Sequence, residues 1–251
     1  PYDSMTRKKG FIDMEIFKIS VDNIINHAAN KLISLHHFGD PILHPKIIDL
    51  VDFTTHKGLV AHISTVGNTL NKQHIDMLTK RDLRILFSIA GKDKDEFEKY
   101  QKVSYEKTIQ NINWFIKENK KATIAIEILV KNIDDKIQHP KAWDKYSNIT
   151  QMHNWIGDNQ TVNNSTVNLK PSSKPCLKLF SGDLKILFNG DVVPCCMDYD
   201  GKEVIGNIKE SSLIEIWNGP RINKLRKLHI EGKRKEIDLC KNCFNCSPRQ
   251  L

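Results

Sequence analysis

The first 175 residues of this 251-residue chain contain no cysteine, and all six cysteines lie between Cys176 and Cys246. No apolar run approaches the roughly 18–20 residues of a membrane span, which excludes a membrane-spanning helix. The start of the sequence carries no secretory signal, and it begins at Pro1 instead of a methionine. Clustered cysteines without such a signal argue against disulfides, so we expect metal or redox chemistry in a reducing, cytoplasmic compartment.

The composition is that of a globular protein. Hydrophobic residues make up 39% of the chain and charged residues 27%, enough to bury a core in one large domain or in one domain plus a small one. The formal net charge is +8. Such a charge indicates either a lysine-rich surface or an acidic partner such as a phosphate, a nucleotide or a nucleic acid. The lysines are spread along the whole chain, which favours the first interpretation.

Strand-like and helix-like segments alternate over the first 155 residues. A helical pattern follows Asp13, and further helices are predicted near 45–58, 71–80, 93–102, 104–119 and 140–146. The predicted strands lie between them, at 32–37, 59–64, 83–88, 122–130 and 149–155. Strands separated by helices predict βα units and a parallel sheet. We expect either an open, doubly wound sheet or part of a (β/α) barrel.

Polar or glycine-containing stretches follow four of the predicted strands. In both types of sheet, binding and catalytic residues gather at the carboxyl ends of the strands. Each stretch alone is typical of an ordinary loop, but four of them at equivalent strand ends indicate a shared site. They are Gly39-Asp40-Pro41, Thr65-Val66-Gly67-Asn68, Ser88, and His153-Asn154-Trp155.

Residues 157–175 form a polar stretch that is rich in Asn, Ser and Thr and contains Pro171 and Pro175. Such a composition is typical of a connecting loop. A flap over an active site is the alternative interpretation of the same stretch.

The last third of the chain begins with a predicted β-hairpin. Residues 184–188 and 192–195 flank Asn189-Gly190, a strong hairpin signal because both turn residues must reach positive φ. Pro194 then implies an edge strand, since proline cannot donate to a sheet. The other elements predicted here are a turn at 206–207 and helices at 213–217 and 220–230.

The cysteines are placed so that the hairpin and the end of the chain can bring them together. Cys176 precedes the hairpin, Cys195-Cys196 ends it, and Cys240-x2-Cys243-x2-Cys246 follows. Four cysteines hold either a tetrahedral zinc ion or a 4Fe–4S cluster. Spacing alone does not separate the two, and zinc is the more general interpretation. A zinc site would make the chain a non-enzymatic four-cysteine module on an α/β scaffold, binding nucleic acid through its positive charge.

The same C-terminal stretch closely resembles the SPASM/twitch module of radical S-adenosylmethionine (SAM) enzymes. The ending is most similar to the twitch type, which holds one auxiliary cluster. Upstream, 38–45 resembles the Gly-Glu-Pro-Leu motif of that family, 64–68 its Thr-Asn-Gly stretch, and 87–91 its Ser-Ile-Asp-Gly stretch. The stretches that carry the C-terminal resemblance are Cys176, 184–196, Gly206-Asn207-Ile208, 212–218 and Leu239-Cys240-Lys241-Asn242-Cys243.

This resemblance implies an α/β fold: a partial (β/α)6 TIM-like radical-SAM barrel lacking its first strand, with a small C-terminal β-hairpin plus helix iron–sulfur module. The barrel would span residues 1–168 and the SPASM/twitch auxiliary-cluster domain residues 169–251. The signature Cys-x3-Cys-x2-Cys of the family does not occur in the sequence. Since the stretch after Pro1 resembles the segment that follows this motif, we expect the motif just upstream, in a longer protein.

The resemblance also assigns residues to the cofactors. Cys196 and Cys246 have no required counterpart in the family pattern. Asp40, Val66 and Ala90 stand where the family usually has Glu, Asn and Asp. The implied ligands of the auxiliary cluster are Cys176, Cys195, Cys240 and Cys243. The implied SAM-binding residues are Gly39, Asp40, Pro41, Thr65 and Ser88. The candidates for a base that removes a substrate proton are His153, Asp198 and Glu127.

The activity implied by the resemblance is that of a radical SAM oxidoreductase. A reduced 4Fe–4S cluster in the upstream segment would cleave SAM to methionine and a 5′-deoxyadenosyl radical. That radical would abstract hydrogen from a sugar or aminocyclitol alcohol or from a peptide side chain, and the auxiliary 4Fe–4S cluster would accept the substrate electron. The implied partners are a small-molecule or peptide substrate and a flavodoxin- or ferredoxin-type electron donor, without a membrane or a nucleic acid.

Overall fold

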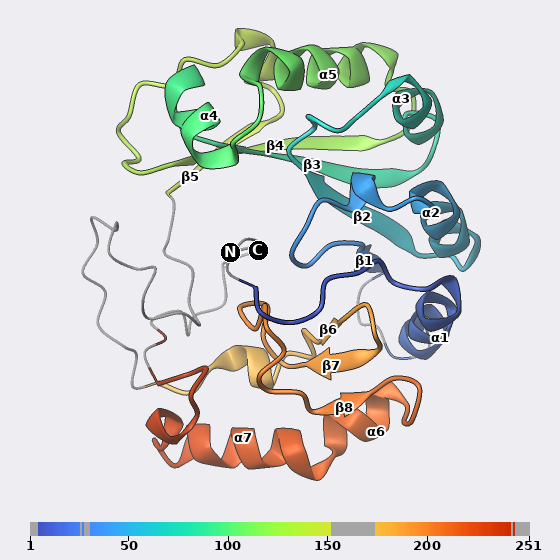
Figure 1. Ribbon diagram of the computed structural model, residues 1–251, viewed down its shortest axis with the longest axis vertical. Coiled ribbons are helices and arrows are strands. Elements are labelled where there is room, and N and C mark those ends of the chain that lie inside the picture. Colours follow the sequence, from blue (N-terminus) through green and yellow to red (C-terminus); the bar gives the residue numbers. More distant parts are fainter. Residues whose placement is uncertain (1–4, 26, 28–30, 152–173, 242, 244–251) are drawn as a thin grey trace. The chain divides into compact units, whose positions relative to one another are not determined.

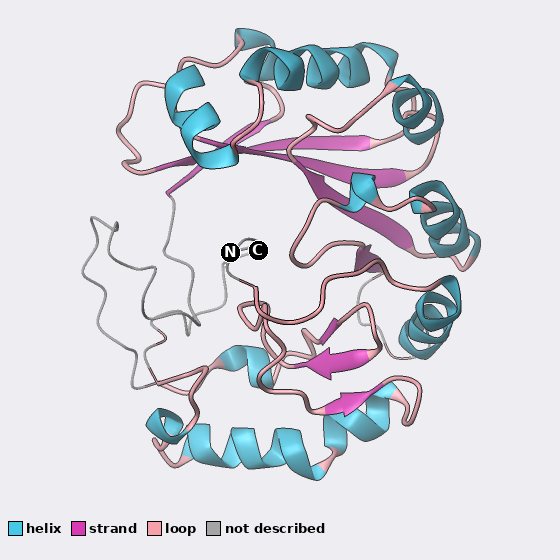
Figure 2. Cartoon of the chain, viewed as in Figure 1, coloured by secondary structure: helices cyan, strands magenta, loops and turns pink. Residues whose placement is uncertain are grey.

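The computed structural model of the protein describes residues 5–25, 27, 31–151, 174–241 and 243. The chain forms two compact units. The sheet unit consists of residues 29–152, and the cysteine unit joins residues 1–28 to residues 153–251. Each unit has its own sheet and its own apolar core (Figure 2). The predicted domain boundary between residues 168 and 169 lies outside the described residues and stays a prediction.

The sheet unit contains five parallel strands that neighbour one another in sequence order. The α/β class predicted from the sequence is therefore confirmed. An order without reversal is that of a barrel wall, whereas a doubly wound sheet reverses at a switch point. Because the strands are parallel, their carboxyl ends share one edge. The strands are β1 (Leu32–Ser34), β2 (Val60–Thr65), β3 (Leu83–Ala90), β4 (Thr123–Val130) and β5 (Ser147–Gln151).

Helices in the connections cover one side of this sheet (Figure 1). The apolar core lies between them and the strands, where Phe87 of β3 and Phe115 of α5 are fully buried with ring centroids 5.7 Å apart. None of the helices in the described part of the chain combines the length and hydrophobicity that crossing a membrane requires. The helices of the sheet unit are α2 (Ile47–His56), α3 (Lys72–Leu78), α4 (Lys94–Gln101) and α5 (Tyr105–Glu118).

Side-chain caps explain where three of these helices start. Asn71, Asp93 and Ser104 each accept a hydrogen bond from the backbone N–H three residues later. The predicted start of α2 at residue 45 is wrong, since the helix begins at Ile47. The N–H of Lys46 donates a hydrogen bond to Nδ1 of His44, which forms a turn before the helix.

Two further sequence predictions in the sheet unit are wrong in their bounds. β1 ends at Ser34 instead of continuing to residue 37, since its pairing register with β2 runs from Leu32 to Ser34. The helix predicted at 140–146 is a single 3₁₀ turn at Lys141–Trp143. β5 begins at Ser147, which leaves no room for a longer helix before it.

The cysteine unit holds a three-stranded antiparallel sheet. The predicted hairpin is present as β6 (Lys185–Ile186) and β7 (Asp191–Val193). The expectation that both turn residues reach positive φ is wrong, because Gly190 has a φ of +93° but Asn189 does not reach positive φ. β8 (Gly206–Asn207) pairs with β7, so the prediction of a mere turn there is wrong. Gly206 is required at this position because a Cβ would lie 2.7 Å from Cγ1 of Ile216.

Residues from both ends of the chain build the cysteine unit. Its helices are α1 (Met14–Ile25), α6 (Leu213–Asn218) and α7 (Pro220–Ile230), and α1 packs Ile16 and Ile19 against the core of the unit. Oδ1 of Asn23 accepts a 3.1 Å hydrogen bond from the N–H of Leu213. These contacts join the start of the chain to its last third.

Candidate metal centre

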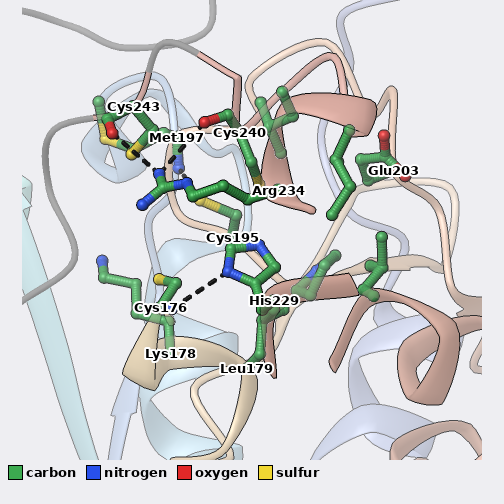
Figure 3. A pocket seen from close by; sticks show the side chains of 14 residues that line it. Cys176, Lys178, Leu179, Cys195, Met197, Glu203, His229, Arg234, Cys240 and Cys243 are labelled. Atoms are coloured by element: carbon green, nitrogen blue, oxygen red, sulfur yellow. Dashed lines mark hydrogen bonds between the residues drawn. The ribbon is translucent and has the colours of Figure 1, made fainter. Parts of the chain in front are cut away.

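The four cysteines predicted to be cluster ligands line one cavity in the cysteine unit (Figure 3). Cys176 precedes a 3₁₀ turn, Cys195 follows β7, and Cys240 and Cys243 follow α7 and a second 3₁₀ turn. Segments far apart in the sequence therefore bring these four cysteines to the wall of one cavity. Much of the remaining wall is apolar, with Leu179, Pro194, Met197, Leu225, Ile237 and Leu239.

Local backbone structure positions the cysteines. The tight hairpin places Cys195 just beyond β7, where its Sγ accepts a 3.3 Å hydrogen bond from the N–H of Met197. The N–H of Cys243 donates to the carbonyl oxygen of Cys240 over 3.1 Å. This bond folds the Cys-x2-Cys segment into a turn, so both of its cysteines reach the cavity.

Arg234 supports this turn from inside the protein. Its side chain is only 4% exposed. Nη2 donates to the carbonyl oxygens of Cys240 and Cys243, over 3.1 Å and 2.8 Å, and Nη1 donates to the carbonyl oxygen of Lys174 over 3.2 Å. A buried guanidinium thus fixes the backbone of two predicted ligands and brings a positive charge to the cavity. Sequence patterns alone did not single out this residue.

His229 of α7 is the second buried polar residue at the cavity, with 1% of its surface exposed. Its Nδ1 accepts a 3.2 Å hydrogen bond from the N–H of Cys176. Burial, together with the charge of Arg234, lowers the pKa of His229 to about 4, so the imidazole is neutral at physiological pH. Its Nε2 is buried and has no hydrogen-bond partner in the described part of the chain.

Cys196 differs from its neighbour Cys195. It is not among the residues that line the cavity, and Nζ of Lys178 donates a hydrogen bond to its Sγ. The hydrogen bond with Cys195 and the ammonium of Lys178 lower the pKa of Cys196 below its usual value. By contrast, burial raises the pKa of the Cys240 thiol to about 12. Cys246, the sixth cysteine, lies outside the described residues.

The residues around the cavity fit a cysteine-held iron–sulfur cluster. Four cysteines line a largely apolar cavity, and Lys178 and Arg234 supply positive charge that offsets thiolates. The buried nitrogen of His229 offers a donor of the kind that commonly supports metal-bound sulfur. Within the described ranges, no three His, Cys, Asp or Glu side chains are grouped as they would be around a single metal ion.

A second group of predicted residues meets at the carboxyl ends of β1 and β2 in the sheet unit. Oδ2 of Asp40 accepts hydrogen bonds from the hydroxyl groups of Thr65, over 2.7 Å, and Thr69, over 3.2 Å. Its Oδ1 caps a 3₁₀ turn that starts at Pro41 by accepting the N–H of Ile42. Burial raises the pKa of Asp40 above its usual value despite these hydrogen bonds. Gly39 precedes it in the same loop.

The structure also brings Ser88 and Glu127 together. They are direct neighbours in the register of β3 and β4, so their side chains lie on the same face. Residues alternate along both strands, and the helix-covered face carries Phe87 and Ile126 instead. The half-buried Ser88 and Glu127 therefore lie on the opposite face, where a small molecule can contact both side chains.

The other two candidate bases have different settings. Asp198 is 1% exposed in the cysteine unit, and its carboxylate oxygens accept the N–H groups of Lys202 and Glu203, each over 2.8 Å. Both of these bonds belong to a backbone turn, which favours a structural role for Asp198. His153 lies outside the described residues.

Asn111 of α5 is a positioning residue that the sequence patterns did not reveal. Its Nδ2 donates to the carbonyl oxygens of Gly67 and Leu70 over 2.9 Å and 3.0 Å, and of Asn68 over 3.2 Å. The side chain is 6% exposed and holds the loop after β2. An amide among the apolar positions of an amphipathic helix was the available signal.

With the geometry of the cavity established, comparison with known families is informative. Residues 176–246 match the SPASM iron–sulfur cluster-binding domain. This segment includes all four cysteines that line the cavity. A relative from Niallia circulans, named S-adenosyl-L-methionine-dependent 2-deoxy-scyllo-inosamine dehydrogenase, is 45% identical over 58 residues. The match spans 23% of this chain and 23% of that relative, so most of both proteins lies outside it.

Solved structures resemble the fold over nearly the whole chain. BtrN in complex with AdoMet and 2-DOIA is 20% identical, with a TM-score of 0.58, and the match covers 100% of this chain and 89% of BtrN. The structure of anSMEcpe with bound AdoMet and the Kp18Cys peptide is 14% identical, with a TM-score of 0.65, covering 96% of this chain and 84% of that one. Together with the SPASM segment and the named relative, these findings confirm the resemblance predicted from the sequence.

Proposed function

We propose that the chain is the substrate- and auxiliary-cluster-binding part of a radical SAM oxidoreductase. The observation that carries the proposal is the convergence of Cys176, Cys195, Cys240 and Cys243 on one cavity, within the segment that matches the SPASM domain. These four cysteines would hold a 4Fe–4S cluster, and such a cluster accepts single electrons. Cys196 is the matched non-ligand, since its sulfur pairs with Lys178 instead.

We place SAM at the carboxyl ends of β1 to β3. SAM presents an ammonium group and a carboxylate, and Asp40, hydrogen-bonded and held by Thr65, offers an oxygen acceptor for the ammonium. Gly39 and Pro41 contribute backbone groups on either side of it, and Ser88 offers a hydroxyl for the carboxylate or ribose. Fixed donors and acceptors at a strand edge serve to position a reactive cofactor and to exclude water from it.

For the substrate we propose an alcohol of a sugar or aminocyclitol, with a peptide side chain as the second class. The relative named as a dehydrogenase and the BtrN complex with 2-DOIA support the first, and the anSMEcpe complex with a peptide supports the second. Cleavage of SAM supplies a 5′-deoxyadenosyl radical that takes a hydrogen atom from the substrate. Glu127 is the base that we favour for the following proton removal, because it lies beside Ser88 on the face away from the helices.

Cleavage of SAM needs a cluster of its own. The Cys-x3-Cys-x2-Cys motif that holds it does not occur in these 251 residues. We propose that a sequence preceding Pro1 supplies it and that a flavodoxin- or ferredoxin-type protein donates the electron. We also propose a reducing, cytoplasmic compartment, in which the clustered cysteines stay available as cluster ligands.

The competing function is a non-enzymatic zinc module that binds nucleic acid through the net charge of +8. Analysis of iron, zinc and acid-labile sulfide after anaerobic preparation separates the two. We expect a brown protein with iron and sulfide in equal amounts. Zinc without iron, together with salt-sensitive binding of DNA or RNA, would sink the proposed function.

A further inference from the structure

A buried hydrogen-bond donor without a partner lies on the wall of the cysteine cavity. Nε2 of His229 has no hydrogen-bond partner in the described part of the chain, although the side chain is 1% exposed. An unsatisfied polar group of this kind destabilises the folded state, and native structures rarely keep one without a reason. Figure 3 shows the His229 ring beside Cys176 and Cys195. Its environment therefore points to an acceptor inside the cavity.

The hydrogen bond at the other ring nitrogen fixes what Nε2 can do. Nδ1 accepts from the N–H of Cys176 over 3.2 Å, so it carries no proton. The single proton of a neutral imidazole is then on Nε2. A protonated nitrogen cannot bind iron, which excludes His229 as a fifth ligand. It can only donate.

We propose that Nε2 of His229 donates a hydrogen bond to a sulfur atom of the cluster held by the four cysteines, and so raises the reduction potential of that cluster. The inference rests on the proposed function, because it requires the cluster. His229 is thus a positioning and tuning residue: one nitrogen orders the backbone of Cys176, and the other contacts the bound group. No proton is transferred in this arrangement.

The direction of the effect follows from electrostatics. A cluster gains one negative charge on reduction, and a hydrogen bond to its sulfur is stronger when that charge is present. The donor therefore stabilises the reduced state more than the oxidised state. In a cavity with apolar walls the difference is larger than in water. A higher potential makes the cluster a better acceptor for a substrate electron.

Three variants separate the functions of the two nitrogens. His229→Asn keeps an acceptor near the position of Nδ1 for the N–H of Cys176, but its shorter side chain does not reach the position of Nε2. His229→Gln places an amide N–H close to that position. His229→Phe removes both functions while filling the space.

The experiment is a redox titration of the anaerobically reconstituted 251-residue chain, followed by electron paramagnetic resonance. All cysteines of this chain lie between Cys176 and Cys246, so its iron–sulfur signal comes from this region. At the midpoint potential of the unchanged chain, we expect His229→Asn to show a roughly tenfold lower ratio of reduced to oxidised cluster, equal to about 59 mV for one electron. His229→Gln should stay within about twofold of the unchanged chain.

Failure of this inference differs from failure of the proposed function. An unchanged chain that binds no iron contradicts the proposed function itself. A second outcome is that the unchanged chain binds iron, but His229→Asn and His229→Phe both show its ratio of reduced to oxidised cluster. In that case the proposed hydrogen bond does not exist. If the variants take up less iron, their potentials cannot be compared with that of the unchanged chain. Pulsed electron paramagnetic resonance on the unchanged chain with ¹⁵N-labelled histidine then tests the hydrogen bond directly. A weak coupling to one imidazole nitrogen, lost in His229→Gln, supports the proposal, and no coupling overturns it.

Discussion

The two units of the chain differ in what fills their interiors. The sheet unit packs its helices on its strands through side chains such as Phe87, Phe97 and Phe115, all fully buried. Three of its buried polar side chains, Thr54, Thr79 and Asn111, are hydrogen-bonded to backbone carbonyl oxygens of the same unit. The cysteine unit instead buries Arg234 and His229 beside a cavity with four thiols.

This difference indicates how each unit is stabilised. A large, closely packed apolar core such as that of the sheet unit is stable without a bound group. A small unit with short strands, buried cationic and neutral donors and a thiol-lined cavity gains much of its stability from what it binds, because binding free energy becomes folding free energy. Mutations that act on one unit alone test this comparison.

The largest expected effect is the loss of the cluster on removal of a predicted ligand. In Cys176→Ala or Cys240→Ala we expect iron and sulfide to fall to background, because each removes one of the four sulfur donors at the cavity. Chemical analysis of anaerobic preparations measures this. Cys196→Ala is the matched control and should keep its iron, and equal loss in all three variants would overturn the assignment of ligands.

A core mutation in the sheet unit should lower the stability of the chain without changing its iron content. Phe115→Ala removes a fully buried ring that packs on Phe87, which costs about 3–5 kcal/mol of unfolding free energy. Urea unfolding followed by circular dichroism measures the cost, and the iron content of the folded fraction should not change. Lys117→Ala, an exposed change on the same helix, is the control. A parallel fall in iron content would show that the two units are not independent in stability.

Arg234→Lys should have a smaller effect, confined to the cysteine unit. Lysine keeps the charge but cannot bridge the carbonyl oxygens of Cys240, Cys243 and Lys174 as the guanidinium does. We expect a loss of about 1–3 kcal/mol in stability and a faster release of iron to a chelator. Stopped-flow absorbance measures the release. Arg221→Lys, an exposed change on α7, should release iron at the unchanged rate, and identical rates in both variants would argue against a supporting role for Arg234.

The smallest effect is expected from the titration of Asp40. Burial raises the pKa of this carboxyl above its usual 3.8, so the folded state binds the proton more tightly than the unfolded state. The contribution of Asp40 to the unfolding free energy should therefore fall as pH rises from 3.8 to the folded pKa, and then level off. Asp40→Asn lacks this contribution, whereas the other carboxyl groups titrate in both proteins. Urea unfolding across this pH range should show that the unfolding free energy of the unchanged chain, minus that of the variant, falls with rising pH, and a constant difference would contradict a stability cost from the buried carboxylate.

Local patterns were sufficient to predict much of this molecule. The turn at Asn189-Gly190 predicted the hairpin that places Cys195. The helices predicted to start at residues 71, 93 and 104 are present, and the structure shows Asn71, Asp93 and Ser104 as their caps. Resemblance to a known family selected four of six cysteines, and the structure places those four around one cavity. Their role as ligands stays a prediction.

Contacts between distant residues could not be predicted in this way. Arg234 forms a hydrogen bond with Lys174, which is 60 positions away in the sequence, and His229 forms one with Cys176, which is 53 positions away. Asn23 meets Leu213 across 190 positions, which ties the first helix to the last third of the chain. No local periodicity reports such pairs, because an arginine or a histidine near a helix end looks like any surface residue until the fold buries it.

The proposed function depends above all on a 4Fe–4S cluster held by four cysteines in the cysteine unit. Mössbauer spectroscopy of the 251-residue chain, reconstituted with ⁵⁷Fe and sulfide without oxygen, is the decisive measurement. We expect roughly four irons per chain in one diamagnetic species with the averaged valence of an oxidised 4Fe–4S cluster, retained in Cys196→Ala. A chain that takes up zinc in preference to iron, or only isolated ferric ions without sulfide, would contradict this assignment.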